Sequence, residues 1–360
     1  MQCLAEFVPV CLVIECKCTL LTFFTKTSEN MKTQLPETLL EAIQYYDDAD
    51  VCRNQLAVMR WAVGVVCPRC SCDRATFVQS VQRWNCKGCR NQFSAKVGTI
   101  FEDSPLGLDK WFCAMWLIAG AKNGNSSCEI ARAIGVTQKS AWYMLHSIRA
   151  AMKSGTIEKM SGTVEIDEIF IGGLEKNKHE HRKRNAGRGV VGKSVVLGIL
   201  ERGNGTKDES GNHLKMNERI FSQVQATVIR DTSREALQAV IKCRVNDGTT
   251  IFTDAHRGYN GLEGSYLNAY IDHAVKYDEA NVSTNGIENV WSLFDRIVHG
   301  TYIKLEPQHL SRYIDEQAFR FNKRGGTDLT RFLQTLQQVS GKRLTCDALT
   351  TGHLQYMVPK

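Results

Sequence analysis

The sequence lacks any uninterrupted apolar stretch long enough to cross a membrane, which takes about 20 residues, and it has no internal repeat. Its most apolar segment, residues 1–24, is broken by Glu6, Glu15 and Lys17, and no positive charge precedes it, unlike a signal peptide. We therefore expect no membrane partner. We interpret residues 1–30 as a non-functional or misassigned extension, with Met31 as the working start of the chain.

A strong excess of one charge is also missing. The 45 Lys and Arg residues stand against 38 Asp and Glu, a formal charge of +7 that mildly favours a polyanionic partner. A length of 360 residues with 43% hydrophobic composition suggests roughly two or three domains. The fourteen cysteines do not indicate a disulfide scaffold, because such scaffolds are short secreted chains and five of these cysteines fall between Cys67 and Cys89. The sequence favours a reducing compartment and one metal site.

Two Cys-x2-Cys pairs form that candidate site: Cys67-Pro-Arg-Cys70 and Cys86-Lys-Gly-Cys89. Their spacing lets two tight turns place four thiolates tetrahedrally about Zn²⁺. With all four positions filled by protein, the zinc is expected to be structural, and Gly88 is expected at a positive φ. The alternatives are four free buried cysteines, or competition for the metal by the spare thiol of Cys72.

Residues 127–145 have the form of a helix-turn-helix, with a turn at Gly135 and a second helix capped by Thr137. Gln138 and Lys139, together with Tyr143, would then face a DNA groove. A helix pair with a purely structural role is the alternative.

Three carboxylates lie in apolar surroundings where a buried charge is costly unless a cation neutralises it. Asp167 lies inside an expected strand, Asp254 ends another, and Glu288 lies beside the apolar face of an expected helix. Such a trio can bind two Mg²⁺ or Mn²⁺ ions, which prefer oxygen ligands. Glu165 and Glu168 are rivals to Asp167, and solvation or capping is the alternative for each acid.

Basic residues near these acids are candidates for contacts to the DNA backbone. Most lie in a loop between the first two strands, and two lie near the other acids. The alternative for the loop is that its charges are simply solvated. These DNA-binding candidates are Arg182, Lys183, Arg184, Arg188, Lys193, Arg257 and Arg296.

The periodicity beyond residue 162 predicts a mixed α/β domain, in which strands come first and helices then alternate with them. The expected strands are 163–171, 194–200, 219–228 and 250–253, and the expected helices are 233–243, 285–297 and 308–322. The whole chain is expected to comprise a helical lead-in (31–61), a zinc ribbon (62–98), a helix-turn-helix region (105–152), the α/β domain (162–324), and a C-terminal helix and tail (325–360).

The ordered set of motifs resembles prokaryotic insertion-sequence transposases related to the eukaryotic Merlin elements, over about Leu39 to Arg324. The resemblance rests on the cysteine pairs, on Val164-Glu-Ile-Asp-Glu-Ile-Phe-Ile-Gly-Gly, on Thr253-Asp-Ala-His-Arg-Gly-Tyr-Asn-Gly-Leu, and on Asn285-Gly-Ile-Glu-Asn-Val-Trp-Ser-Leu-Phe. It implies an RNase H-like catalytic fold that depends on Mg²⁺ or Mn²⁺, with Asp167, Asp254 and Glu288 as the catalytic DDE triad.

The same resemblance implies recognition of terminal inverted repeats in double-stranded DNA, followed by cleavage and strand transfer into target DNA. It also implies a homo-oligomer in a synaptic complex and, for a prokaryotic protein, a cytoplasmic, nucleoid-associated location. One departure stands out, because Asp295 occupies the position, seven residues after Glu288, where the family usually has a basic residue. A catalytically inactive DNA-binding protein derived from a transposase is therefore one alternative, and a nuclease without strand transfer is another.

Overall fold

The structure is a computed structural model of the 360-residue chain. It describes residues 34–153, 158–172, 192–205, 212–254, 256–271 and 283–351. The proposed extension, residues 1–30, lies outside these ranges, as do Arg182, Lys183, Arg184 and Arg188 of the basic loop. Among the described helices, none is long and apolar enough to span a bilayer.

Two helices precede the cysteine-rich segment: α3 (Leu39–Tyr45) and α4 (Ala49–Arg60). Helix α3 does not bury its large apolar side chains. Leu39, Leu40 and Ile43 are exposed, whereas Ala42 is buried. The large side chains of α3 therefore contribute little to the core.

The cysteine-rich segment is a small antiparallel sheet in the order β1-β2-β3. Its elements are β1 (Ala75–Val78), the 3-10 turn η1 (Gln79–Val81), β2 (Arg83–Cys86) and β3 (Gln92–Phe93). The core is little more than the ring of Trp84, which packs against Phe77, Phe93 and Trp61. So small a core rarely holds a fold without a metal or another crosslink.

A helical region follows, in which α5 (Leu108–Gly120) packs against α6 (Ser127–Ile134) and α7 (Gln138–Met152). Gly135 ends α6 with a φ of 64°, a left-handed conformation that glycine adopts freely. Thr137 then caps α7, accepting a hydrogen bond from the Ser140 amide at 3.1 Å. Two helices from the far end of the sequence complete the described chain: α11 (Asp328–Gln337), which packs against α5, α4 and α7, and α12 (Cys346–Thr350).

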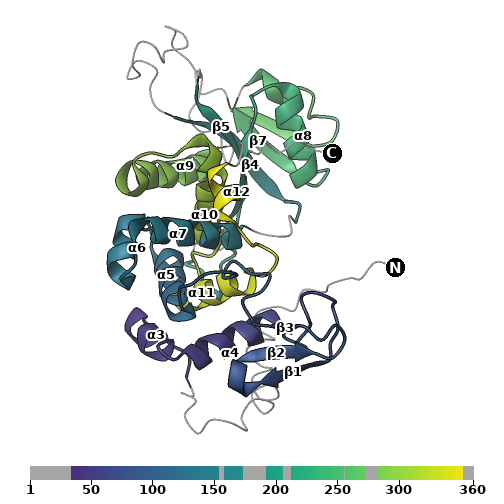
Figure 1. The fold of residues 1–360 in the computed structure, drawn as a ribbon. Coiled ribbons are helices and arrows are strands. Elements are labelled where there is room, and N and C mark those ends of the chain that lie inside the picture. Colours follow the sequence, from purple (N-terminus) through teal and green to yellow (C-terminus); the bar gives the residue numbers. More distant parts are fainter. Residues whose placement is uncertain are drawn as a thin grey trace. The chain divides into compact units, whose positions relative to one another are not determined.

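The second sheet has five strands in the order β6-β5-β4-β7-β8 and is mixed (Figure 1). Strands β6, β5 and β4 pair antiparallel, whereas β4, β7 and β8 pair parallel. The bounds are β4 (Thr163–Ile171), β5 (Ser194–Glu201), β6 (Gln223–Ile229), β7 (Thr250–Asp254) and β8 (Leu267–Ile271). The mixed α/β architecture expected from the sequence is confirmed.

Helices cover both faces of this sheet. Helix α8 (Arg234–Arg244) shares a buried cluster with Val164, Ile166 and Ile251 on one face. Helices α9 (Asn285–Ile297) and α10 (Leu310–Asn322) share another with Val196, Leu200 and strand β6 on the opposite face. Short helical turns link these elements: η4 (Met216–Glu218), η5 (Arg257–Tyr259), the π-helical η6 (Val298–Tyr302) and η7 (Pro307–His309).

One predicted strand begins later than expected, and one strand of the structure was not predicted. The strand expected from Arg219 begins only at Gln223, after the turn η4. No strand is predicted from the sequence at β8, a segment of five residues that begins at an exposed Leu267. Its pairing with β7 defines it as a strand.

Candidate functional site

The acids of β4 divide between the two faces of the sheet. Side chains alternate along a strand, and Val164 and Ile166 face the cluster under α8, so Glu168 shares their face. Ile169 packs against the cluster formed with α9, so Glu165 and Asp167 face that helix. The side chains of Asp167 and Glu168 therefore lie on opposite faces of the sheet, although the two residues are adjacent in sequence.

Asp254 lies at the end of β7, beside Asp167. In the parallel register Ile166 pairs with Thr253, and the next step along both strands brings Asp167 next to Asp254. Ile251 faces the α8 cluster, so Asp254, three residues on, faces the α9 side with Asp167. The two aspartates therefore lie on one face of adjacent strands, although they are far apart in the sequence.

Glu288 comes from the first turn of α9, where it is exposed. The Thr284 hydroxyl donates a hydrogen bond to Glu288 Oε1 at 2.9 Å. Buried Ile287, Val290 and Trp291 pack the neighbouring face of the helix against the sheet. Glu288 therefore lies at the edge of this apolar face, close enough for its charge to act on Asp167.

Gly198 permits this close approach of α9. It pairs with Asp167 across β4 and β5, and a Cβ atom there would lie 2.8 Å from Ile287 Cδ1 and would overlap the ring of Trp291. Any side chain at this position would push the helix away from the strand that carries Asp167.

Gly198→Ala is therefore expected to lower the free energy of unfolding by about 1–3 kcal/mol through overpacking. Urea titration followed by circular dichroism measures the change. Gly264→Ala is the matched control, because a Cβ atom there meets nothing within 4 Å. Equal stability of the two variants would contradict the packing explanation.

The acids influence one another electrostatically. Burial, together with the charges of Asp254, Glu168 and Glu288, raises the pKa of Asp167 to about 7. Burial also raises the pKa of Glu168, whose Oε1 has no hydrogen-bond partner among the described residues. No ion pair involves Asp167 or Glu288 in the described part of the chain. Burial and mutual repulsion disfavour the ionised forms of these carboxylates, and a divalent cation bound by their oxygens would offset that cost.

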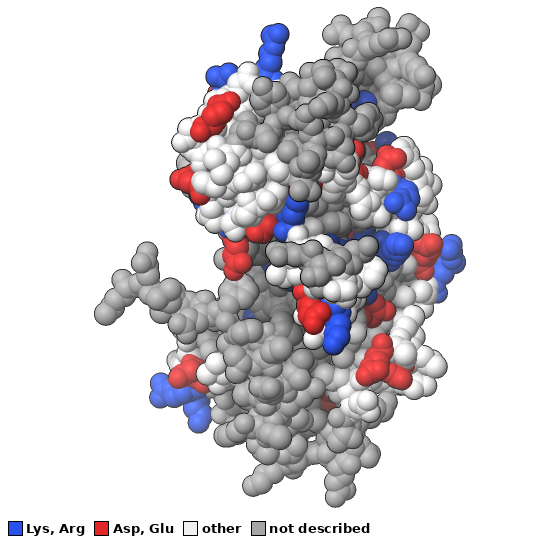
Figure 2. Space-filling model, turned by 180° about the vertical axis from the view of Figure 1, so that it is seen from behind, with Lys and Arg blue, Asp and Glu red and all other residues white. Residues whose placement is uncertain are grey.

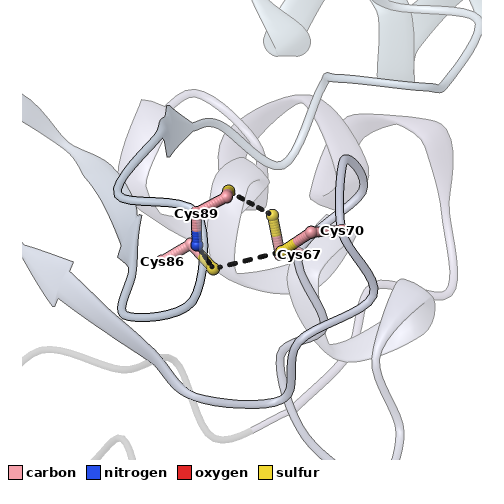
Figure 3. A group of neighbouring side chains, drawn as sticks. All are labelled: Cys67, Cys70, Cys86 and Cys89. Atoms are coloured by element: carbon pink, nitrogen blue, oxygen red, sulfur yellow. Dashed lines mark hydrogen bonds between the residues drawn. The ribbon is translucent and has the colours of Figure 1, made fainter.

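The four cysteines of the ribbon converge more closely (Figure 3). Among the described residues they are the one group of three or more metal-ligating side chains whose ligand atoms all lie within 4.8 Å of one another. The Sγ atoms of Cys67 and Cys89 are 3.7 Å apart, and those of Cys70 and Cys86 are 3.6 Å apart. Zn–S bonds of ~2.3 Å in a tetrahedron give sulfur separations of about 3.8 Å. The cluster therefore fits zinc, whereas the acidic side chains do not converge to this degree.

The two cysteine turns are built alike. The residue after the second cysteine of each pair, Ser71 or Arg90, has a φ of 56°. The expectation that Gly88 supplies the positive φ is wrong. A Cβ atom at Gly88 would lie 3.0 Å from both Cβ and Sγ of Cys72, so glycine is needed there for space.

Thiolate formation is favoured at one of these ligands, because hydrogen bonds from Asn91 lower the pKa of Cys89 to about 6. Thiolates are the form that binds zinc.

The predicted DNA-contacting residues that the structure describes are mostly exposed. Gln138 and Lys139 lie in the first turn of α7, Arg257 follows β7, and Arg296 lies on α9. Lys193, before β5, is half-buried.

Tyr143, expected to face a DNA groove, is half-buried, and its hydroxyl donates to the carbonyl of Leu344. Asp295 is exposed on the same side of α9 as Glu288, two turns on, and His299 Nε2 lies 3.1 Å from its carboxylate.

Basic and acidic side chains are interspersed on the face drawn in Figure 2. The net positive charge is thus not gathered on the coloured part of this face.

Comparison with known proteins places these features in two domains. Residues 159–322 match the ISXO2-like transposase domain, and residues 47–92 match a transposase zinc-ribbon domain. The two matches together cover more than half of the chain. The chain belongs to the ISXO2-like insertion-sequence transposases that carry an N-terminal zinc ribbon.

Two relatives support this assignment. An uncharacterized protein in transposable element ISH50 of Halobacterium salinarum is 26% identical over 257 residues, which span 68% of this chain and 81% of the relative. An uncharacterized transposase-like protein of Haemophilus influenzae is 26% identical over 101 residues, which span 28% of this chain and 81% of the relative.

Proposed function

We propose that this protein is a DDE-type transposase, in which Asp167, Asp254 and Glu288 form the catalytic centre of an RNase H-like domain. The observation that carries the proposal is the placement of Asp167 beside Asp254 on the face of the sheet covered by α9, whose first turn bears Glu288. These residues all lie within the segment that matches the transposase domain.

Asp167 is favoured over its two rivals. Glu168 faces the opposite side of the sheet, and both oxygens of Glu165 already accept hydrogen bonds, from Arg202 Nε at 2.6 Å and from the Ile287 amide at 2.9 Å. Asp167 is thus the β4 acid that shares a face with Asp254 and Glu288 and makes no ion pair among the described residues.

In the proposed reaction, a water oxygen attacks a phosphorus atom at the element end and releases a 3′-hydroxyl. That hydroxyl then attacks a phosphodiester of the target DNA, joining the strands and releasing the target's own 3′-hydroxyl. Bound Mg²⁺ or Mn²⁺ would activate the attacking oxygen and stabilise the leaving oxygen. The three carboxylates would hold the cations, and Arg257, after β7, and Arg296, on α9, would contact DNA phosphates.

The zinc ribbon and the α6–α7 pair are proposed to read the terminal inverted repeats. The left-handed turn at Gly135, with Gln138 and Lys139 exposed at the start of α7, supports a helix-turn-helix. Gln138 Nε2 also donates to Ser127 Oγ at 2.7 Å, which ties the two helices together. Because two DNA ends must be joined, we expect at least two copies of the chain to act together in a synaptic complex.

The test is Mg²⁺-dependent cleavage and joining on DNA that carries the element's own terminal repeats. Asp254→Asn is expected to lower the rate by at least about 10²-fold, because it removes a charge that stabilises the transition state through the cation. The matched control is Asp247→Asn, which neutralises an exposed aspartate just before β7. Equal loss in both variants would contradict the assignment of Asp254.

A second candidate, a DNA-binding protein without catalysis, is favoured by Asp295. This acid lies on the same side of α9 as Glu288, so it would meet DNA phosphates with the wrong charge. Specific binding of the terminal repeats without cleavage by the intact protein would support this second function.

A further inference from the structure

Glu165 caps the N-terminus of α9 from a strand that lies far away in sequence. The local residue at the cap position, Thr284, makes no side-chain hydrogen bond to the first-turn amides. Instead, Glu165 Oε2 accepts from the Ile287 amide at 2.9 Å. A carboxylate at this end of a helix is favoured by the helix dipole as well as by the free amides. The start of α9 is therefore anchored to β4.

Gly286 makes this contact possible. A Cβ atom at this position would lie 2.8 Å from Glu165 Oε2 and 2.9 Å from Oε1. The backbone of α9 thus lies against the carboxylate with no room for a side chain between them.

Arg202 holds the other side of the same carboxylate. Its Nε donates to Glu165 Oε1 at 2.6 Å, and Glu165 is only 2% exposed. Its Nη2 donates to the carbonyl of Ser283 at 2.6 Å and to the Ser283 hydroxyl at 3.0 Å, just before α9. The guanidinium also lies over the ring of Phe252, 4.8 Å from its centre.

The pair therefore connects the three elements that carry the acids. Glu165 lies two residues before Asp167 on β4, and Phe252 lies two residues before Asp254 on β7. Ile287, whose amide Glu165 accepts, directly precedes Glu288 on α9.

We propose that Glu165 and Arg202 form a positioning clamp that aligns Asp167, Asp254 and Glu288 for binding divalent cations. The inference rests on the proposed function, because it assigns a role to residues around the same acidic centre. Glu165 is buried and both of its carboxylate oxygens already accept hydrogen bonds, so the clamp would act through the carboxylates that it positions. Buried partners of metal ligands commonly change metal affinity by 10- to 100-fold when they are removed.

The test measures binding of Mn²⁺ alone to the zinc-loaded full chain without DNA, from the electron paramagnetic resonance signal of free Mn²⁺. Asp254→Asn identifies the binding that belongs to the acidic centre. Glu165→Gln removes the charge of the clamp, and Gly286→Ala displaces the Glu165 carboxylate without changing any charge. Alanine is the better helix former, so weaker binding in Gly286→Ala would not come from a lower intrinsic helix propensity.

Two controls separate positioning from general stability. Gly264→Ala adds a methyl group in open space, and Met144→Ala removes a buried side chain from α7, which contributes nothing to the clamp. Glu165→Gln and Gly286→Ala are expected to weaken Mn²⁺ binding at least about tenfold, while both controls bind as the wild type does. If Glu165→Gln fails to fold, Gly286→Ala decides the test.

The possible failures are distinguishable. If Asp254→Asn abolishes Mn²⁺ binding but Gly286→Ala and Glu165→Gln bind normally, the clamp is overturned and the acidic centre stands. If Asp254→Asn leaves Mn²⁺ binding unchanged, the acidic centre itself is overturned and the clamp with it. Equal weakening in Met144→Ala would show that stability alone controls the affinity and would also overturn the clamp.

Discussion

Cys86→Ser is expected to abolish zinc binding and to unfold the ribbon of β1–β3. Cys86 is buried and its Sγ lies 3.6 Å from that of Cys70, so serine removes one of four converging ligands. Structural zinc sites contribute about 10–16 kcal/mol of apparent binding free energy at neutral pH. The ribbon has little besides the packing around Trp84 to replace that contribution. Metal analysis should find one zinc per wild-type chain and none in the variant, and hydrogen exchange should show loss of protection in β1–β3.

The spare thiol of Cys72 requires a second variant in this experiment. Its Sγ lies 3.0 Å from the place of a Cβ atom on Gly88, close enough to the cluster to move in as a substitute. The double variant Cys86→Ser, Cys72→Ser removes that possibility. Cys243→Ser, at an exposed position on α8, is the control. A full zinc content in the double variant, or loss of zinc in the control, would contradict the four-cysteine site.

Local patterns made much of the fold predictable. Strand β4 and helix α9 have the bounds that the periodicity predicted, because buried residues recur along each with the spacing of its own structure. The cysteine site was predictable for a similar reason, since a Cys-x2-Cys turn forms within four residues. The left-handed turn at Gly135 was predictable because a glycine between two capped helices has few other uses.

Features that depend on distant pairing were not predictable. The sequence indicated three acids but not their neighbours, because Asp167 meets Asp254 only through the parallel register of β4 and β7. Arg202 was missed altogether as a site residue. Its partner Glu165 is 37 positions away, and only the pairing of Glu165 with Leu200 across β4 and β5 brings them together. An acid in an apolar strand indicates that its carboxylate has a partner, but the sequence does not indicate which residue that partner is.

The packing of α11 is another example. Its apolar spacing indicates a helix, but nothing in residues 325–360 reveals that it packs against α4 and α5, which lie far earlier in the sequence. The position of α11 depends on tertiary contacts, and the local sequence pattern does not indicate which contacts a helix makes.

Glu316→Ala is expected to cause one of the largest losses of stability in this chain. Glu316 is fully buried on α10 and pairs with Arg149 Nε of α7 at 2.5 Å and with Arg320 Nη1. The Tyr302 hydroxyl, from η6, donates to Glu316 Oε1 at 2.6 Å. Removing one partner of a buried ion pair typically costs about 3–5 kcal/mol, because it leaves an uncompensated charge, and here two buried arginines would remain. Urea unfolding at neutral pH measures the loss.

Glu306→Gln is the matched control, because it removes one negative charge from an exposed pair with Lys304. A surface pair of this kind contributes little to stability. A control variant as unstable as Glu316→Ala would contradict the role assigned to burial.

The pH dependence provides a second check on Glu316. Burial alone would raise the pKa of this carboxyl, but Arg320, Arg149 and the Tyr302 hydrogen bond outweigh it and hold the pKa below the ordinary 4.5. A lowered folded-state pKa stabilises the fold above 4.5, and this contribution is lost as the pH falls through the folded-state value. The free energy of unfolding of Glu316→Gln should therefore fall below that of the wild type by the full amount at neutral pH, and the difference should shrink below pH 4.5. A deficit that grows in acid would contradict the ionised state of Glu316.

The Glu316 carboxylate connects the helix that is proposed to contact DNA with the segment that follows the helix bearing Glu288. Arg149 lies on α7, whose first turn is proposed to contact DNA, whereas Tyr302 lies on η6, which continues directly from the helix that bears Glu288. Arg149 also lies over the ring of Tyr313, 4.1 Å from its centre, so α7 and α10 meet through aromatic as well as ionic contacts. Glu316→Gln should therefore loosen α7 and η6 together, and hydrogen exchange should show faster opening in both elements. Faster exchange in α7 alone would mean that Tyr302 is held by its ring packing with Tyr313 and not by the carboxylate.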